Sequence, residues 1–78
     1  MNKNEKQQLI HTAMIQRFES EISTSKANLA IYFDNPAGIG EHENVVQEMV
    51  KLTRKIADAQ GCIDSLNEVF ADLYPESL

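Results

Sequence analysis

Side chains that bind metal ions gather in the stretch FDNPAGIGEHEN, residues 33–44. Three carboxylates and one imidazole, the ligand types of a divalent-metal site, come from Asp34, Glu41, His42 and Glu43. Residues 41–43 are consecutive on the helix expected after this stretch, so their side chains spread around its axis and do not converge on one ion. We therefore predict no metal site here and no cofactor.

The same stretch contains two glycines on either side of an isoleucine, Gly38-Ile39-Gly40. A Gly-x-Gly turn that opens a helix can present free backbone N–H groups to an anion. Here no lysine follows, no strand precedes, and Glu41 and Glu43 would repel a phosphate, so the phosphate signal is weak. Ile39 is either a plug that folds back on the helices or an apolar tip offered to a partner.

One basic cluster interrupts the acidic sequence and consists of Lys51, Arg54 and Lys55. Arg54 can pair with Asp58 four residues on, and Glu48 with Lys51 three residues on. The favoured interpretation is a solvated helix face, and an anion-binding strip is the alternative.

Three reactive or polar side chains fall on apolar helix faces. His11 and Ser25 suit a buried hydrogen-bonding pair, a metal ligand or a pH switch. The simpler interpretation, which we favour, places His11 at the open end of the fold and lets Ser25 bond back to its own helix. Cys62, the single cysteine, has no base at helical spacing and is expected to pack as a small, partly buried hydrophobe. A lone thiol also suggests a reducing compartment.

The second half of the chain carries a sustained heptad pattern, in which apolar residues alternate at spacings of 4 and 3. Its members are Val45, Met49, Leu52, Ile56, Ala59, Ile63, Leu66, Phe70 and Leu73. This pattern predicts a coiled-coil-like helix over residues 42–74, which Pro75 ends, with a short tail at 75–78.

The first half predicts another helix, over residues 4–33. Asn4 is the expected N-cap, with Gln7 in the capping-box position. The expected apolar stripe consists of Ile10, Met14, Ile15, Phe18, Ile22, Leu29, Tyr32 and Phe33.

Residues 34–41 form the expected turn between the two helices. Pro36 forces Asn35 out of helical geometry, and the glycines allow the chain to reverse. Two long helices joined by one turn predict an all-α fold, an antiparallel helical hairpin that forms a single domain over residues 1–78. Additional apolar residues beside the main stripe, Val46, Val50, Cys62 and Val69, suggest a second seam and hence a homodimer that pairs as a four-helix bundle.

Composition narrows the class of partner and the location. The formal net charge is −5, and a nucleic-acid binder needs clustered lysine and arginine, so nucleic acid is not the expected ligand. No segment reads as a signal peptide or a membrane span. The expected location is the cytoplasm.

The turn NPAGIGEHENVVQEM resembles small uncharacterised helical-hairpin proteins of tailed bacteriophages, which carry a turn of the form N-P-x-G-(I or V)-G-E-H. The matching residues are Asn35, Pro36, Gly38, Ile39, Gly40, Glu41 and His42. This resemblance covers about half the chain and implies a phage origin, a hairpin fold and a location in the host cytoplasm. It implies no activity.

Three functions follow from these features, and none is enzymatic, because no nucleophile–base pair or nucleotide fingerprint is present. The first is an oligomeric adaptor or inhibitor that binds a host or defence protein through the turn residues. The second is a sponge that sequesters a small anion such as a nucleotide at a subunit interface, through Lys51, Arg54 and Lys55. The third is a structural or assembly component, which the sequence does not distinguish from the first.

Overall fold

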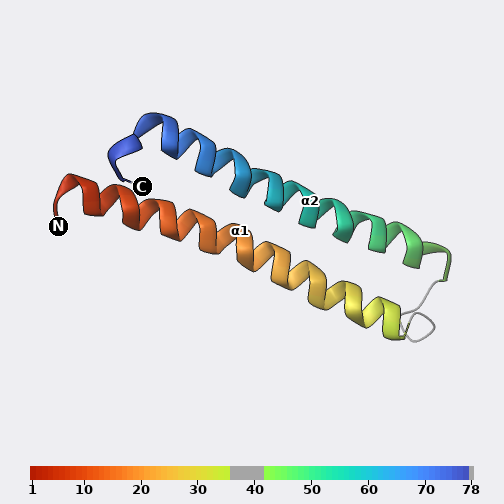
Figure 1. Ribbon diagram of the computed structural model, residues 1–78. Coiled ribbons are helices and arrows are strands. Elements are labelled where there is room, and N and C mark those ends of the chain that lie inside the picture. The colour runs from red at the N-terminus through yellow and green to blue at the C-terminus, as the bar shows by residue number, and fades with distance from the viewer. Residues whose placement is uncertain (36–41, 78) are drawn as a thin grey trace.

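The computed structural model describes residues 1–35 and 42–77, with the side chains of residues 42, 43 and 77 excepted (Figure 1). Helix α1 spans Lys3–Asp34, helix α2 spans His42–Leu73, and a short 3-10 helix, η2, spans Pro75–Ser77. The two long helices, of 32 residues each, pack against each other as an antiparallel hairpin. Both chain ends lie at the same end of the molecule, which we call the open end.

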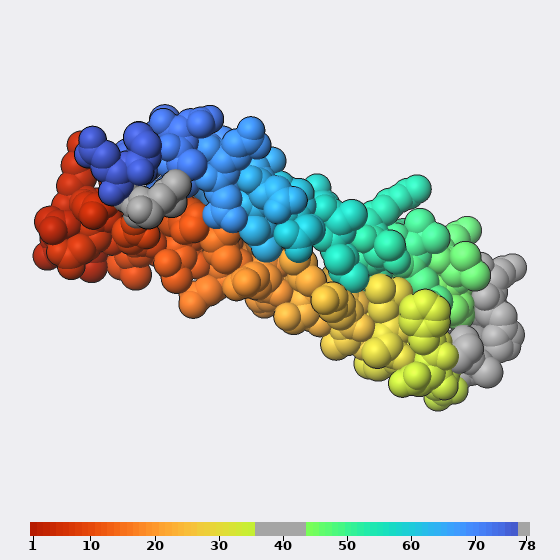
Figure 2. All heavy atoms as spheres, viewed as in Figure 1, coloured from red at the N-terminus to blue at the C-terminus, as the bar shows by residue number. Residues whose placement is uncertain are grey.

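The hairpin is a narrow rod of 53 × 21 × 13 Å (Figure 2). The described residues contain no strand. In the described part of the chain, neither long helix has an apolar stretch of the length that a lipid bilayer requires.

The first helix begins with a capping box at Asn2, so the prediction of a cap at Asn4 is wrong. The Glu5 backbone N–H donates to Asn2 Oδ1 at 2.8 Å, and the Asn2 backbone N–H donates to Glu5 Oε1 at 3.4 Å. Asn2 followed by Glu5 outcompetes Asn4 followed by Gln7 because an ionised carboxylate is the stronger acceptor and also suits the positive end of the helix dipole.

The second helix ends at Leu73, one residue earlier than predicted. Tyr74 still donates its backbone N–H to the Phe70 carbonyl at 2.8 Å. Pro75 follows and starts η2, since proline cannot continue the helix with its own N–H.

The face of α1 that packs on α2 differs from the predicted stripe. Its buried and half-buried residues recur at spacings of 4 and 3 and comprise His11, Ile15, Phe18, Ile22, Ser25, Leu29 and Tyr32. Three members of the predicted stripe are exposed instead: Ile10 is 61% exposed, Met14 42% and Phe33 72%. A strict heptad period keeps one line of residues against the partner helix. The polar His11 and Ser25 belong to this line and pack on α2, whereas the neighbouring apolar residues do not.

On α2 the predicted heptad line does face α1. Its first eight members, from Val45 to Phe70, are buried or half-buried, and the ninth, Leu73, is 63% exposed. Tyr74 is half-buried in its place, with its ring centroid 5.3 Å from that of Phe70.

The seam between the helices is thin. Among the described residues only Val45, Ala59, Phe70 and Ser25 are buried, and no large side chain is completely enclosed. In a pair of helices each apolar side chain is covered from one side only. The hairpin therefore has a single line of contact between its helices and not the enclosed core of a larger domain.

Candidate functional site

One face of the hairpin carries a line of residues from each helix. The α1 line lies directly beside the seam, and the α2 line shares Leu52, Ala59 and Leu66 with the seam. On α1 the line is Ile10, Met14, Arg17, Glu21, Thr24, Asn28 and Ile31. On α2 it is Leu52, Lys55, Ala59, Cys62, Leu66, Val69 and Leu73. Both lines keep the alternating spacing of 3 and 4, so each holds one helix face along the rod. We call this surface the groove face, because the hollows described below open between its two lines.

At the open end, the groove face holds an apolar groove of about 210 Å³. Its lining consists of Gln7, Ile10, His11, Met14, Leu66, Val69, Phe70, Leu73 and Tyr74. The two helices contribute equally to its exposed rims, Ile10 and Met14 from α1 and Val69 and Leu73 from α2.

His11 ties the two helices together in this groove. The His11 Nε2–H donates a hydrogen bond across the seam to Asn67 Oδ1, at a distance of 2.8 Å. The imidazole also lies against the Phe70 ring, with centroids 4.5 Å apart. The prediction that His11 lies at the open end is therefore correct, and the side chain bridges α1 and α2 there. No group of three His, Cys, Asp or Glu side chains suited to a metal ion occurs among the described residues.

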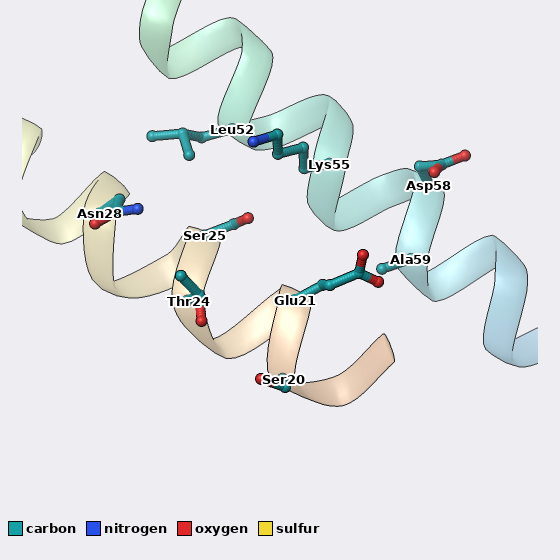
Figure 3. A pocket seen from close by; sticks show the side chains of 9 residues that line it. All are labelled: Ser20, Glu21, Thr24, Ser25, Asn28, Leu52, Lys55, Asp58 and Ala59. Carbon is teal, nitrogen blue, oxygen red and sulfur yellow. The ribbon is translucent and has the colours of Figure 1, made fainter. Parts of the chain in front are cut away.

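Near mid-length, the groove face opens into a polar cleft of about 440 Å³ (Figure 3). It is lined by Ser20, Glu21, Thr24, Ser25, Asn28, Leu52, Lys55, Asp58 and Ala59. Ser25 and Glu21 extend from α1 toward α2, whereas the Asp58 carboxylate points away from α1. A neighbouring hollow of about 460 Å³ shares Asn28, Leu52 and Lys55 and continues toward the turn.

The cleft exists because two small residues occupy the seam there. Ser25 is 4% exposed and Ala59 3%, and both line the cleft. Both side chains are short, so they form the floor of the cleft and the longer side chains around them form its walls.

The three basic residues expected to form a strip have different surroundings. Lys51 pairs with Glu48 at 3.3 Å on the surface, where such a pair contributes little stability. Lys55 lines the cleft, together with the carboxylates of Glu21 and Asp58. Arg54 lines neither hollow near mid-length, and the expected ion pair of Arg54 with Asp58 does not occur among the described residues. Of the three, only Lys55 lines the cleft, and an anion-binding role for Lys51, Arg54 and Lys55 stays a prediction.

Most of the turn residues singled out by sequence fall outside the described residues: Pro36, Gly38, Ile39, Gly40 and Glu41. Asn35 is described and caps α1, with its backbone N–H donating to the Ile31 carbonyl at 3.0 Å. His42 is the first residue of α2, and its side chain is not described. A recognition role for this turn stays a prediction.

Cys62 is a free, half-buried thiol on the groove face. Its partial burial agrees with the expectation of a small packed hydrophobe.

Sequence reasoning missed the groove and the cleft for identifiable reasons. Ile10 and Met14 are apolar, which favours the seam. Each of them, however, precedes a seam residue, His11 or Ile15, by one position and therefore lies on the neighbouring face of α1. The signal for the cleft was present as two small residues, Ser25 and Ala59, at equivalent heptad positions of antiparallel helices.

Comparison of the chain with protein-family models, with curated proteins and with solved structures finds no match.

Proposed function

We propose that the chain is a small non-enzymatic interaction protein, which self-associates through its helices into a four-helix bundle and captures a protein partner. The observation that carries this proposal is the large apolar surface that the hairpin leaves exposed. Among the described residues ten large hydrophobic side chains are exposed, and none of the large side chains is completely enclosed.

The accessible surface supports self-association quantitatively. The chain exposes 5857 Å² and has a mass of 8.8 kDa. A compact monomer of that mass exposes about 4,800 Å² by the usual scaling, so the hairpin carries roughly 1,000 Å² in excess. A standard interface buries about 800 Å² on each partner, so one such contact removes most of the excess.

The nature of the captured partner follows from the resemblance of the turn to phage hairpin proteins. A phage protein that lacks catalytic residues acts by occupying a surface of another protein, and in the host cytoplasm that is a host protein or a defence component. Ending one helix and starting the next does not require the apolar Ile39 or His42, three positions later in the sequence. These two residues are therefore the proposed recognition tip.

The test is capture of a partner from host lysate by tagged variants, with the captured protein identified by mass spectrometry. The double substitution I39A/H42A is expected to abolish capture while leaving the far-UV circular dichroism unchanged. The control L9A/T12A changes exposed residues of α1 distant from the turn and is expected to retain capture. If I39A/H42A captures the same protein as well as the control does, the turn is not the recognition surface.

A second candidate function, the small-ligand sponge, is favoured by the polar cleft. Its lining combines the hydroxyl groups of Ser20, Thr24 and Ser25 and the amide of Asn28 with the ammonium group of Lys55. However, the lining contains two carboxylates for one ammonium group, so a single hairpin does not favour an anion there. The sponge therefore requires a second chain that brings another lysine to the cleft, and for this reason it ranks below the interaction protein.

The sponge has a matched pair of variants. If the cleft binds an anion, Lys55→Gln lowers affinity at least tenfold in equilibrium dialysis against a nucleotide panel. Arg54→Gln removes the same charge from a residue outside the cleft lining and leaves that affinity within about twofold. Equal losses in both variants, or no binding by the unaltered chain, would remove the sponge from consideration.

A further inference from the structure

We propose that the groove face is the surface on which a second copy of this chain packs, with the two open ends together. In this arrangement Ile10 and Met14 of one copy lie on Val69 and Leu73 of the other. The inference depends on the self-association proposed above and specifies its seam and its orientation.

The first argument is the composition of the groove rims. Ile10, Met14, Val69 and Leu73 are 61%, 42%, 51% and 63% exposed, so none of them is needed to close the hairpin. Polar residues would keep the same helices with less apolar surface in water. Apolar residues at these four positions on both helices indicate a contact that the isolated hairpin does not make.

The second argument is periodicity. The groove-face lines repeat the 4 and 3 spacing of the seam, shifted by one residue on α1. On α1 the groove-face line is therefore a second heptad face, exposed at every position. On α2 the line shares Leu52, Ala59 and Leu66 with the seam, and its exposed members Lys55, Val69 and Leu73 widen the seam on this side. A four-helix bundle requires such an additional face beside the seam within each hairpin.

The third argument sets the orientation. The groove face is apolar at the open end and polar at mid-length, where Glu21, Lys55 and Asp58 line the cleft. If the second copy were reversed along the full length, its apolar groove would lie toward the turn end of the first copy, over the hollow that Asn28, Glu48 and Lys55 line. It would strip these polar groups of water without pairing them, which is costly. With open ends together, apolar groove meets apolar groove and polar cleft meets polar cleft.

The symmetry of this pairing is that of a closed dimer. A two-fold axis along the rod lays α1 of each copy over α2 of the other, and both copies use the same surface. The charges then favour the pairing, because Lys55 on α2 comes over the helix of the other copy that bears Glu21. No further copy can add to the same surface.

The fourth argument is area. Overlap confined to the apolar grooves at the open ends would cover only a short part of the 53 Å rod. A standard interface needs about 800 Å² per partner. A rod face of 53 × 21 Å is large enough for such a contact, and one end of it is not. We therefore assign the contact to the full length of the groove face.

The first test is the oligomeric state of two double variants by sedimentation equilibrium. I10K/L73K places two like charges in each groove rim at exposed positions and is expected to give a helical monomer, with association weakened at least a hundredfold. The matched control F33K/V46K changes two residues that are 72% and 68% exposed and lie outside the groove lining. This control is expected to retain the dimer.

The second test measures orientation with spin labels in a Cys62→Ala background. Single cysteines at Lys3 and at Asp34 report on the open end and on the turn end of the two copies. With open ends together over the full length, both labels give distances between copies well below the 53 Å length of the rod. If only the groove ends overlap, the Asp34 labels lie farther apart than that length, which overturns the full-length arrangement.

The outcomes separate this inference from the proposed function. A wild-type chain that stays monomeric at high concentration contradicts the self-association itself. A wild-type oligomer that I10K/L73K leaves intact, or that F33K/V46K dissolves, contradicts only the choice of the groove face. A dimer in which a Lys3 label on one copy is close to an Asp34 label on the other contradicts only the orientation.

Discussion

Substitution of Phe70 by alanine is expected to unfold the hairpin at room temperature or bring it close to that point. Phe70 is one of three buried hydrophobic residues among those described, and its ring contacts both His11 and Tyr74. Truncating a buried phenylalanine costs about 3–5 kcal/mol. Small domains are stable by only about 5–15 kcal/mol in total, and a two-helix seam lies at the low end of that range.

The measurement is urea denaturation followed by far-UV circular dichroism, with Val46→Ala as control. Val46 is 68% exposed and also lies on α2, so its truncation is expected to change the free energy of unfolding by less than about 0.5 kcal/mol. If Phe70→Ala unfolds at the same urea concentration as the control, the aromatic contact at the open end does not hold the helices together.

Substitution of Ala59 by aspartate is expected to be the second most damaging change, at about 3 kcal/mol. Ala59 is 3% exposed and faces the cleft that already contains the Glu21 and Asp58 carboxylates. A third carboxylate there is buried among like charges, and Lys55 alone is too few cations to offset them.

Ala57→Asp provides the matched control, because the same change two residues earlier is made on an exposed face of α2. Helix propensity is affected almost equally in both variants, so the difference between their unfolding free energies isolates the effect of burial. Equal stability of the two variants would mean that the seam at Ala59 is open to water.

The second helix was predictable because every position of its heptad line is apolar, and this left a single choice of buried face. The first helix was harder, since its apolar residues spread over two neighbouring faces. A rule that places apolar residues inside cannot tell which of these faces meets α2. The regular heptad packing of the two helices decides which face is used, and this face includes the half-buried His11 and the buried Ser25. His11 keeps a hydrogen-bond partner in Asn67, so its half-burial costs little.

The N-terminal cap illustrates a smaller limit of the same kind. Asn2 and Asn4 both have a residue of the correct type three positions later, and only the comparison of Glu5 with Gln7 distinguishes them. For the functional surface, sequence identified residues by type and missed their grouping. Of the three basic residues only Lys55 lines the cleft, whereas Ile10 and Leu73, 63 positions apart in the chain, form the rims of one groove.

The most direct test of the central claim, that this hairpin works as a self-associated bundle, is native mass spectrometry of the gently purified chain over a range of concentrations. The predicted result is a dimer, or a higher even-numbered assembly, in multiples of the 8.8 kDa chain. A species at 8.8 kDa alone, unchanged up to the highest concentration and still fully helical, would contradict the claim.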